Sequence, residues 1–289
     1  MKKIFFYSFF ILVLAFIFTS YELIKYSDDK LHLIICDVGQ GEAIFIVTPE
    51  KSQILIDGGP GKAVLECLGE NMPFWDRSID MVILTHPHAD HYAGLIDVVD
   101  RYGLKSFYTQ DVKSDSDGYK LLEAKLAERN LSAKYLKEGD NFKLKSGMEL
   151  EILSPSLFEL KKYNQSSAYM DVNESSIVSL LSYGNFSALL TGDAEMSVIN
   201  KLNFGVKNIK VLKIPHHGSS GAVTEEFLSK ISPDLSLISV GEGNKFGHPS
   251  KDTISLLNKY KIINLRTDIN GEIELITNGK DLEIESENR

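Results

Sequence analysis

A run of histidine and acidic side chains at residues 85–91 offers the most distinctive chemistry in the chain. The run reads Thr-His-Pro-His-Ala-Asp-His, which places three imidazoles and one carboxylate within six positions. Imidazole nitrogen and carboxylate oxygen together suit zinc or a similar transition metal. A solvated polar loop would gain nothing from concentrating the commonest metal ligand, so we interpret the run as a metal site. We expect His86 and His88 to bind one ion, and Asp90 and His91 to bind a second.

Two elements must position this run. The residues from 81 to 84, directly before it, are continuously apolar, which is typical of a short buried strand. Sites in layered α/β proteins are usually built on loops that leave the carboxyl ends of such strands. Residues 93–102 are predicted to form the helix that follows. The same order of apolar strand and polar loop returns in the second half, ahead of Asp193 and of His216-His217.

The histidine run resembles the His-x-His-x-Asp-His signature of the metallo-β-lactamase fold superfamily. A closer resemblance is to the soluble hydrolase domain of ComEC/Rec2-type competence proteins and to its free-standing relatives. The motifs that carry it stand in the expected order: Asp-Val-Gly-Gln-Gly-Glu-Ala at 37–43, the histidine run, Thr-Gly-Asp at 191–193, His-His-Gly-Ser at 216–219 and Phe-Gly-His-Pro at 246–249. The resemblance covers about residues 31–280. It implies a mixed α/β (α+β) fold, the four-layer αββα sandwich of the superfamily.

The resemblance also implies which residues complete the metal centre. Asp193 would bridge two ions, and either His216 or His217 would join the second site. We favour His217 because the last ligand of other members precedes a small residue, as His217 precedes Gly218. His216 would then contact the substrate.

One departure from the superfamily pattern affects the first site. Many members carry a further histidine before the bridging aspartate, yet no histidine lies between His91 and His216 in this chain. Asn-Glu-Ser-Ser at 173–176 stands in that place, as in the ComEC-like group. We therefore expect two divalent ions, zinc first and manganese as the alternative, with weak occupancy of the site formed by His86 and His88.

A two-metal centre would bind a bridging hydroxide and clamp the oxygens of a phosphodiester or of a strained acyl bond. Asp90 and His248 are the predicted catalytic residues, and His248 would protonate the leaving alkoxide. The alternative for His248 is a residue that only precedes a helix. Hydrogen-bond donors and acceptors for an anionic substrate are predicted at Asn173, Ser175, Lys213, His216, Ser219 and Asn244.

Three polar residues are predicted to support the centre without binding metal. The resemblance assigns Asp57 to orienting the metal loop, as an acceptor for a ligand histidine. Asp37 and Gln40 would line the active site from the turn at 37–43, whose plain alternative is an ordinary hairpin turn.

The composition is that of a globular domain, 43% hydrophobic and 25% charged over 289 residues. No linker divides the body, so we expect one hydrolase domain over 31–280 and a frayed acidic tail at 281–289. The formal net charge of -9 argues against a broad nucleic-acid surface, although a local basic channel is compatible with it. The two cysteines lack the spacing of a zinc ribbon, and Cys36 is expected to be a buried thiol.

Residues 1–26 are interpreted as a membrane-targeting segment. Lys2 and Lys3 precede 18 uncharged residues, from Ile4 to Tyr21, and no small-x-small cleavage site follows. We favour an uncleaved signal anchor over a cleaved signal peptide. Either one places the body outside the cytoplasmic membrane, anchored or secreted. The sequence indicates no protein partner.

Together these observations favour an extracytoplasmic metal-dependent phosphodiesterase or nuclease, with DNA as the first candidate among phosphodiester substrates. One alternative is a cell-surface phosphodiesterase with a substrate other than nucleic acid. Another is a non-catalytic, metal-containing binding module in DNA uptake. A β-lactamase or lactonase is disfavoured because the segment at 173–176 replaces the usual histidine.

Overall fold

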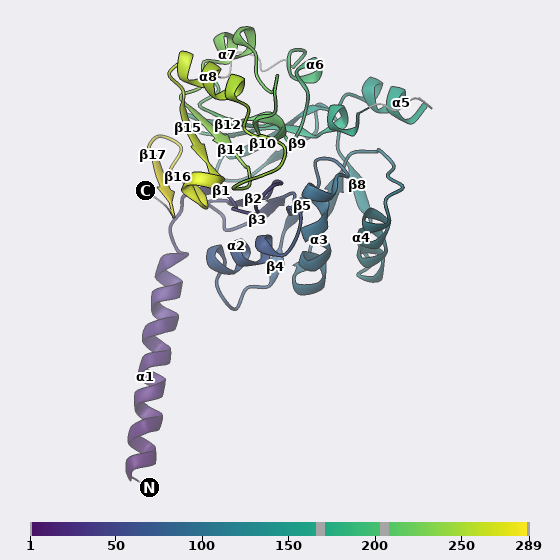
Figure 1. The fold of residues 1–289 in the computed structure, drawn as a ribbon. Helices are drawn as coiled ribbons and strands as arrows, with labels where there is room; N and C mark the ends of the chain where they lie inside the picture. The colour runs from purple at the N-terminus through teal and green to yellow at the C-terminus, as the bar shows by residue number, and fades with distance from the viewer. Residues whose placement is uncertain (1, 166–170, 203–207, 288–289) are drawn as a thin grey trace.

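The protein is an αββα sandwich that carries a long helix at one end. The computed structural model describes residues 2–165, 171–202 and 208–287, so Met1 and the last two residues of the predicted tail lie outside it. Helix α1 (Lys2–Lys25) extends from a body in which two β-sheets pack between layers of helices (Figure 1). The predicted fold class is confirmed.

The first sheet has eight strands among the described residues, in the order β17-β16-β1-β2-β3-β5-β7-β8. Pairing is antiparallel from β17 to β3 and parallel from β3 to β8. The strands are β1 (Leu31–Ile35), β2 (Ile44–Val47), β3 (Gln53–Ile56), β5 (Met81–Ile83), β7 (Phe107–Thr109), β8 (Ala133–Tyr135), β16 (Ile273–Thr277) and β17 (Leu282–Ser286). A small separate pair consists of β4 (Ser78–Ile79) and β6 (Gly103–Leu104).

The second sheet repeats this plan with seven strands in the part of the chain that the structure describes, in the order β15-β14-β13-β12-β11-β10-β9. Strands β9 to β12 pair antiparallel, and β12 to β15 pair parallel. The strands are β9 (Asn141–Lys143), β10 (Glu149–Ser154), β11 (Val178–Tyr183), β12 (Phe186–Leu190), β13 (Val211–Lys213), β14 (Leu235–Ile238) and β15 (Ile263–Arg266). Each sheet thus has a parallel half, whose strands all end at the same edge.

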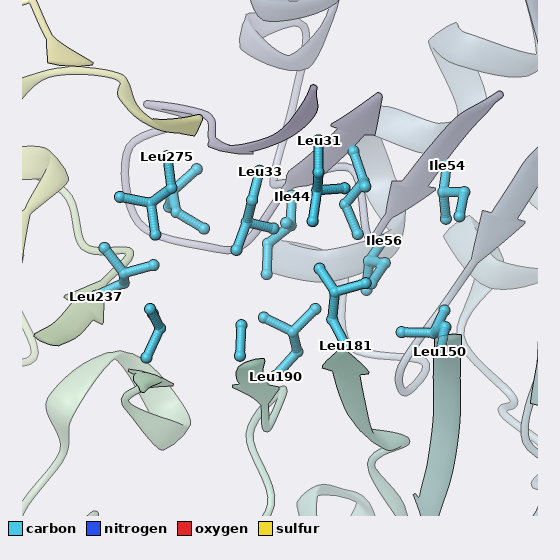
Figure 2. Packing of buried hydrophobic residues seen from close by; sticks show 14 of the residues in the cluster. Leu31, Leu33, Ile44, Ile54, Ile56, Leu150, Leu181, Leu190, Leu237 and Leu275 are labelled. Carbon is cyan, nitrogen blue, oxygen red and sulfur yellow. The ribbon is translucent and has the colours of Figure 1, made fainter. Parts of the chain in front are cut away.

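The alternation of side chains along the strands builds the central core. Leu31 and Leu33 of β1 point toward the second sheet, where Leu190 and Leu237 point back at them (Figure 2). Ile34, between the two leucines, packs on the opposite face beneath the helices. Burial of each such side chain contributes about 1.5–3 kcal/mol, so the facing strands are held together by apolar contact.

Helices cover the outer face of each sheet. Residues of α2, α3 and α4 pack on the first sheet, and residues of α6, α7 and α8 pack on the second. The helices after α1 are α2 (Ala63–Asn71), α3 (Ala89–Arg101), α4 (Asp117–Glu128), α5 (Leu157–Gln165), α6 (Met196–Ile199), α7 (Glu225–Ile231), α8 (Lys251–Lys259) and α9 (Thr267–Asn270), with short 3-10 turns η1 (Val172–Ser175) and η2 (Pro215–Gly218). Helix α3 begins four residues earlier than predicted, so Asp90 and His91 lie in its first turn.

Two expectations about the body were wrong. Cys36 is not a free thiol, because it forms a disulfide with Cys67 of α2, with the two Cα atoms 5.7 Å apart. The tail at 281–289 is not frayed throughout, because β17 pairs along β16 from Leu282 to Ser286. The disulfide depends on contact between segments 31 residues apart, whereas β17 returns along β16 directly after the turn at 278–281.

Helix α1 touches the body near its carboxyl end. The ring of Phe18 lies 5.6 Å from that of Phe74, and the Tyr26 hydroxyl donates a hydrogen bond of 2.9 Å to the Glu70 carbonyl. Among the residues that the structure describes, no helix combines the length and the hydropathy needed to cross a membrane. The membrane-targeting role of residues 1–26 stays a prediction.

Candidate metal centre

The centre lies where the parallel halves of the two sheets end. The run at 85–91 follows β5 of the first sheet, and Asp57 follows the neighbouring β3. Asp193 follows β12 of the second sheet, and His217 follows the neighbouring β13. Since parallel neighbours end at one edge, packing of the sheets brings segments from both halves of the chain together.

Four side chains form a compact group of metal-ligand type. Ligand atoms of Asp90, His91, Asp193 and His217 all lie within 4.8 Å of one another. The Nε2 atom of His217 is 3.5 Å from a carboxylate oxygen of Asp90 and 3.5 Å from one of Asp193. The Nε2 atom of His91 is 3.3 Å from the same Asp193 oxygen.

The other two histidines of the run adjoin this group. The ring of His86 lies 4.1 Å from that of His91 and 4.7 Å from that of His88, measured between centroids. His86 is fully buried, whereas His88 is partly exposed. The structure therefore brings together the residues predicted to hold two ions.

Asp57 is the acceptor that fixes the metal loop from behind. Its carboxylate is completely buried and accepts hydrogen bonds of 2.7 Å from the backbone N–H of Thr85, from the Thr85 hydroxyl and from Nδ1 of His91. With Nδ1 engaged in this way, Nε2 of His91 is left to face the centre. This placement matches the orienting role that the resemblance implied.

His217 is oriented by a carbonyl in the same manner. Its Nδ1 atom donates to the carbonyl oxygen of Ser239 over 2.9 Å, which leaves Nε2 free to face Asp90 and Asp193. The Ser239 hydroxyl donates in turn to the carbonyl of Gly41, in the turn at 37–43. His216 and His217 both have left-handed backbone angles, with φ of 47° and 53°, and this kink turns the two neighbouring rings in different directions.

Burial and neighbouring charges shift the pKa values of these buried side chains, and the direction of the shift differs between residues. Burial, followed by the nearby His91, lowers the pKa of His86 well below its ordinary value, so His86 is neutral and able to bind metal. Burial also acts to lower the pKa of His91, but the carboxylates of Asp193 and Asp57 outweigh it and raise that pKa. Burial acts to raise the pKa of Asp193, yet His217 and His91 lower it well below its ordinary value. An uncharged imidazole beside an ionised carboxylate is the protonation state in which these side chains bind a divalent cation.

Orphaned polar atoms support the same conclusion. His86 Nε2, His91 Nε2, His217 Nε2 and Asp193 Oδ1 are buried and have no hydrogen-bond partner among the described residues. Buried polar atoms are nearly always paired, and an unpaired group of metal-ligand atoms points to an ion. The donor set of imidazoles and carboxylates therefore fits divalent metal.

His216 and His248 lie side by side at the edge of the centre. Their ring centroids are 5.8 Å apart, and Nε2 of His216 is 3.9 Å from the Asp193 carboxylate. Nδ1 of His216 is 3.2 Å from Glu195, and this contact raises the pKa of His216. Burial and the nearby His216 lower the pKa of His248. His217 rather than His216 thus belongs to the compact group, and His216 faces the space beside it.

Lys213 is placed where it cannot contact a substrate, so the predicted substrate-binding role is not supported. Its side chain is completely buried and forms an ion pair with the equally buried Glu42. Its ammonium group also donates to the carbonyl of Gly192 over 3.2 Å. A buried charge needs such a partner, and the pair ties the turn at 37–43 to the end of β13. The bond to Gly192 extends this connection to the loop that carries Asp193.

The side chain of Asn244 also forms its hydrogen bonds within the protein. Its amide group donates to the carbonyls of Gly241 and His248, and its Oδ1 accepts from the backbone N–H groups of Phe246 and His248. All of these bonds lie inside the loop at 241–249, so Asn244 shapes the loop that holds His248. Gln40 supports the start of this loop by accepting a bond of 3.3 Å from the N–H of Gly241.

The remaining predicted residues differ in how well their placement suits a site. Asn173 is buried and its Oδ1 has no partner among the described residues, as expected for a group that meets a ligand. Ser175 is buried as well, but its hydroxyl donates to the Val172 carbonyl over 2.7 Å. Ser219 is partly exposed next to the histidine pair. Asp37 is exposed and accepts a local bond from Gly39, which gives its predicted role no support.

Sequence reasoning gave no role to three residues that the structure places around the centre. Glu42 stands inside a recognised motif, and Glu195 follows Asp193 by two positions, so a search for acids near the motifs would find both. Ser239 carries no such signal, because it holds His217 through its backbone carbonyl and any residue type has one.

Most of this chain is similar in sequence to known proteins. Residues 36–117, which include the histidine run, match the family model of the metallo-β-lactamase superfamily. ComE operon protein 3 of Bacillus subtilis is 30% identical over 258 residues, which is 82% of this chain and 32% of that protein. Recombination protein 2 of Haemophilus influenzae is 28% identical over 245 residues, covering 83% of this chain and 28% of that protein. The chain thus spans about a third of the length of these relatives.

Solved structures share the fold at low identity. Zn(2+)-bound PqqB from Methylobacterium extorquens matches 81% of this chain and 97% of its own, with a TM-score of 0.53 and 12% identity. The metallo-β-lactamase fold protein YhfI from Bacillus subtilis matches 81% of this chain and 95% of its own, with a TM-score of 0.52 and 13% identity. These comparisons identify a metallo-β-lactamase domain in this chain, whose sequence is similar to that of the ComEC/Rec2-type proteins over most of its length.

Proposed function

We propose that this protein is a metal-dependent phosphodiesterase that acts as a nuclease outside the cytoplasm. The observation that carries the proposal is the group of Asp90, His91, Asp193 and His217, whose ligand atoms lie within 4.8 Å of one another. The adjoining His86 and His88 extend this group toward a second ion. The superfamily is hydrolytic in general, and the similarity to a recombination protein and to a ComE operon protein directs the proposal to nucleic acid.

Bound divalent ions would supply the Lewis acidity that activates water and neutralises charge on a phosphodiester. The protein supplies the positioning. Asp57 and the Ser239 carbonyl hold two imidazole ligands in one orientation each, before any substrate arrives. His216 and His248 lie beside the centre, where their N–H groups can donate to a phosphate oxygen and return a proton to the leaving oxygen.

The location outside the cytoplasm rests on two features of the chain. The disulfide between Cys36 and Cys67 is of a kind that persists in oxidising compartments and is rare in the cytosol. The uncharged stretch from Ile4 to Tyr21 follows two lysines, as in segments that direct a chain across a membrane.

The test is hydrolysis by the full chain after metal removal and after addition of zinc or manganese. Substrates are single-stranded DNA, duplex DNA and bis-para-nitrophenyl phosphate. We expect metal-dependent cleavage that falls by at least about 100-fold in His88→Ala, because loss of a ligand removes several kcal/mol of charge stabilisation. His32→Gln is the matched control, since His32 pairs with Asp28 and Glu274 outside the centre and should keep full turnover.

The outcomes separate the candidate functions. Cleavage of the small diester without cleavage of DNA would keep the chemistry and replace nucleic acid by another surface phosphodiester. Metal binding without turnover of any substrate would overturn the proposal and favour a binding module.

A further inference from the structure

An exposed aromatic ring stands on the loop beside the metal centre. Phe246, in the loop at 241–249 between β14 and α8, has 59% of its surface exposed. Its ring is nearly parallel to that of His248, with an angle of 19° between the planes and 5.9 Å between the centroids. The face of a ring at the edge of a site is available to a flat ligand that can stack on it.

The backbone that carries the ring is fixed by hydrogen bonds within the loop. Oδ1 of Asn244 accepts the backbone N–H of Phe246 over 3.1 Å and that of His248 over 3.1 Å. The Asn244 amide donates to the carbonyl of His248 over 2.6 Å. These bonds pre-organise the loop, so a ligand that contacts the ring does not have to order it first.

Contacts between rings connect Phe246 to the metal ligands. His248 stacks on Phe246 and lies 5.8 Å from His216, whose Nε2 is 3.9 Å from the Asp193 carboxylate. A group that rests on Phe246 is therefore adjacent to the position of a phosphodiester at the centre. A nucleic-acid strand places a base next to each phosphate, which matches this arrangement.

We propose that Phe246 is a stacking platform for an unpaired base, which makes single-stranded nucleic acid the substrate of the centre and sets its register over the metal. The inference rests on the proposed function and adds the strand type and the binding residue. Bases of a duplex are already stacked on their neighbours, so an exposed ring selects a strand whose bases are free.

Charge next to the ring supports this substrate. The ammonium group of Lys245 lies 5.5 Å from the centroid of Phe246. Its flexible stem lets it move onto a backbone phosphate when a base covers the ring. An aromatic face with an adjacent cation is the combination that single-strand binding proteins use, and it operates locally despite a formal net charge of -9.

The test measures binding and cleavage separately, with the zinc-loaded full chain. A labelled oligothymidylate and an abasic strand of equal length are compared by fluorescence anisotropy for binding and on gels for cleavage. We expect the abasic strand to bind about tenfold more weakly, since it keeps the phosphates and lacks the bases. Phe246→Ala should weaken binding of oligothymidylate by about the same factor, and Phe246→Trp should restore it.

Trp75→Ala is the matched control. Trp75 is also exposed, at 45%, but it precedes β4 and β5, whereas the metal ligands follow β5. If Phe246→Ala bound oligothymidylate as tightly as the unaltered protein and still cleaved it, the platform would be overturned. The nuclease proposal would then be unaffected. Binding that depends on Phe246 without any cleavage would support the platform and overturn the nuclease. Absence of both binding and cleavage would overturn both.

Discussion

At the residue scale, Asp57 shows how one buried carboxylate organises a metal loop. It accepts three hydrogen bonds of 2.7 Å, two from Thr85 and one from His91. Asp57→Asn removes the charge that orients His91 and should weaken zinc binding about 10- to 100-fold. Zinc titration against a competing chelator measures this change.

The control for Asp57 is Asp76→Asn. Asp76 also accepts several local hydrogen bonds, but from Gln53 and Ser78 rather than from a histidine of the centre. Zinc affinity should be unchanged in that variant. If Asp57→Asn bound zinc as tightly as the unaltered protein, Asp57 would serve only the stability of the loop.

Glu272 introduces a dependence of stability on pH. Burial, and then the neighbouring Glu70 and Glu287, raise its pKa from 4.5 to about 7, although a hydrogen bond from Asn71 opposes the shift. Because the folded pKa lies above the unfolded one, the stabilisation is complete below pH 4.5 and is lost as the pH rises through about 7. Glu272→Gln should therefore raise the free energy of unfolding by about 1–2 kcal/mol at pH 8, allowing for partial exposure, and change it little at pH 4.5.

Urea unfolding at the two pH values checks the effect of Glu272→Gln. Glu285→Gln is the control, since Glu285 is exposed on β17 of the same hairpin. A gain of equal size at both pH values would show that ionisation of Glu272 is not its cause.

At the scale of elements, the disulfide joins the end of β1 to helix α2. Cys36 directly precedes the turn at 37–43, whose Gly41 carbonyl accepts from the Ser239 that orients His217. The bond closes a segment of 31 residues, and loop-closure entropy then contributes about 3–4 kcal/mol to stability. Reduction should lower the free energy of unfolding by about that amount, measured in urea with and without reductant.

The control for the disulfide is Cys67→Ser. This variant lacks the bond in either condition, so reductant should leave its unfolding curve unchanged. Two reactive thiols in the unreduced, unfolded protein would contradict the disulfide.

At the scale of the whole molecule, the metal centre depends on the packing of two sheets. The histidine run belongs to the first sheet, whereas Asp193 and His217 belong to the second. The apolar residues between the sheets hold these halves face to face (Figure 2). Neither half alone carries the compact group, so the geometry of the site is a property of the complete sandwich.

The sequence by itself determined the features that are local. The apolar runs before polar loops predicted the strands that end at the site, because alternation and burial follow from neighbouring residues. The spacing of His86, His88, Asp90 and His91 predicted the donor type, because that choice depends only on side-chain chemistry. The αββα sandwich was predicted through the family resemblance that the ordered motifs carry.

Only the tertiary structure decided which residues turn inward. The backbone kink at His216 and His217 directs one ring into the compact group and the other to its edge. Lys213 and Asn244 have the chemistry of substrate donors, yet packing uses both of them inside the protein. Packing also brought Cys36 and Cys67 close enough to form a disulfide. Each of these outcomes depends on contacts between distant segments or on the course of the folded backbone, which the local pattern of side chains does not encode.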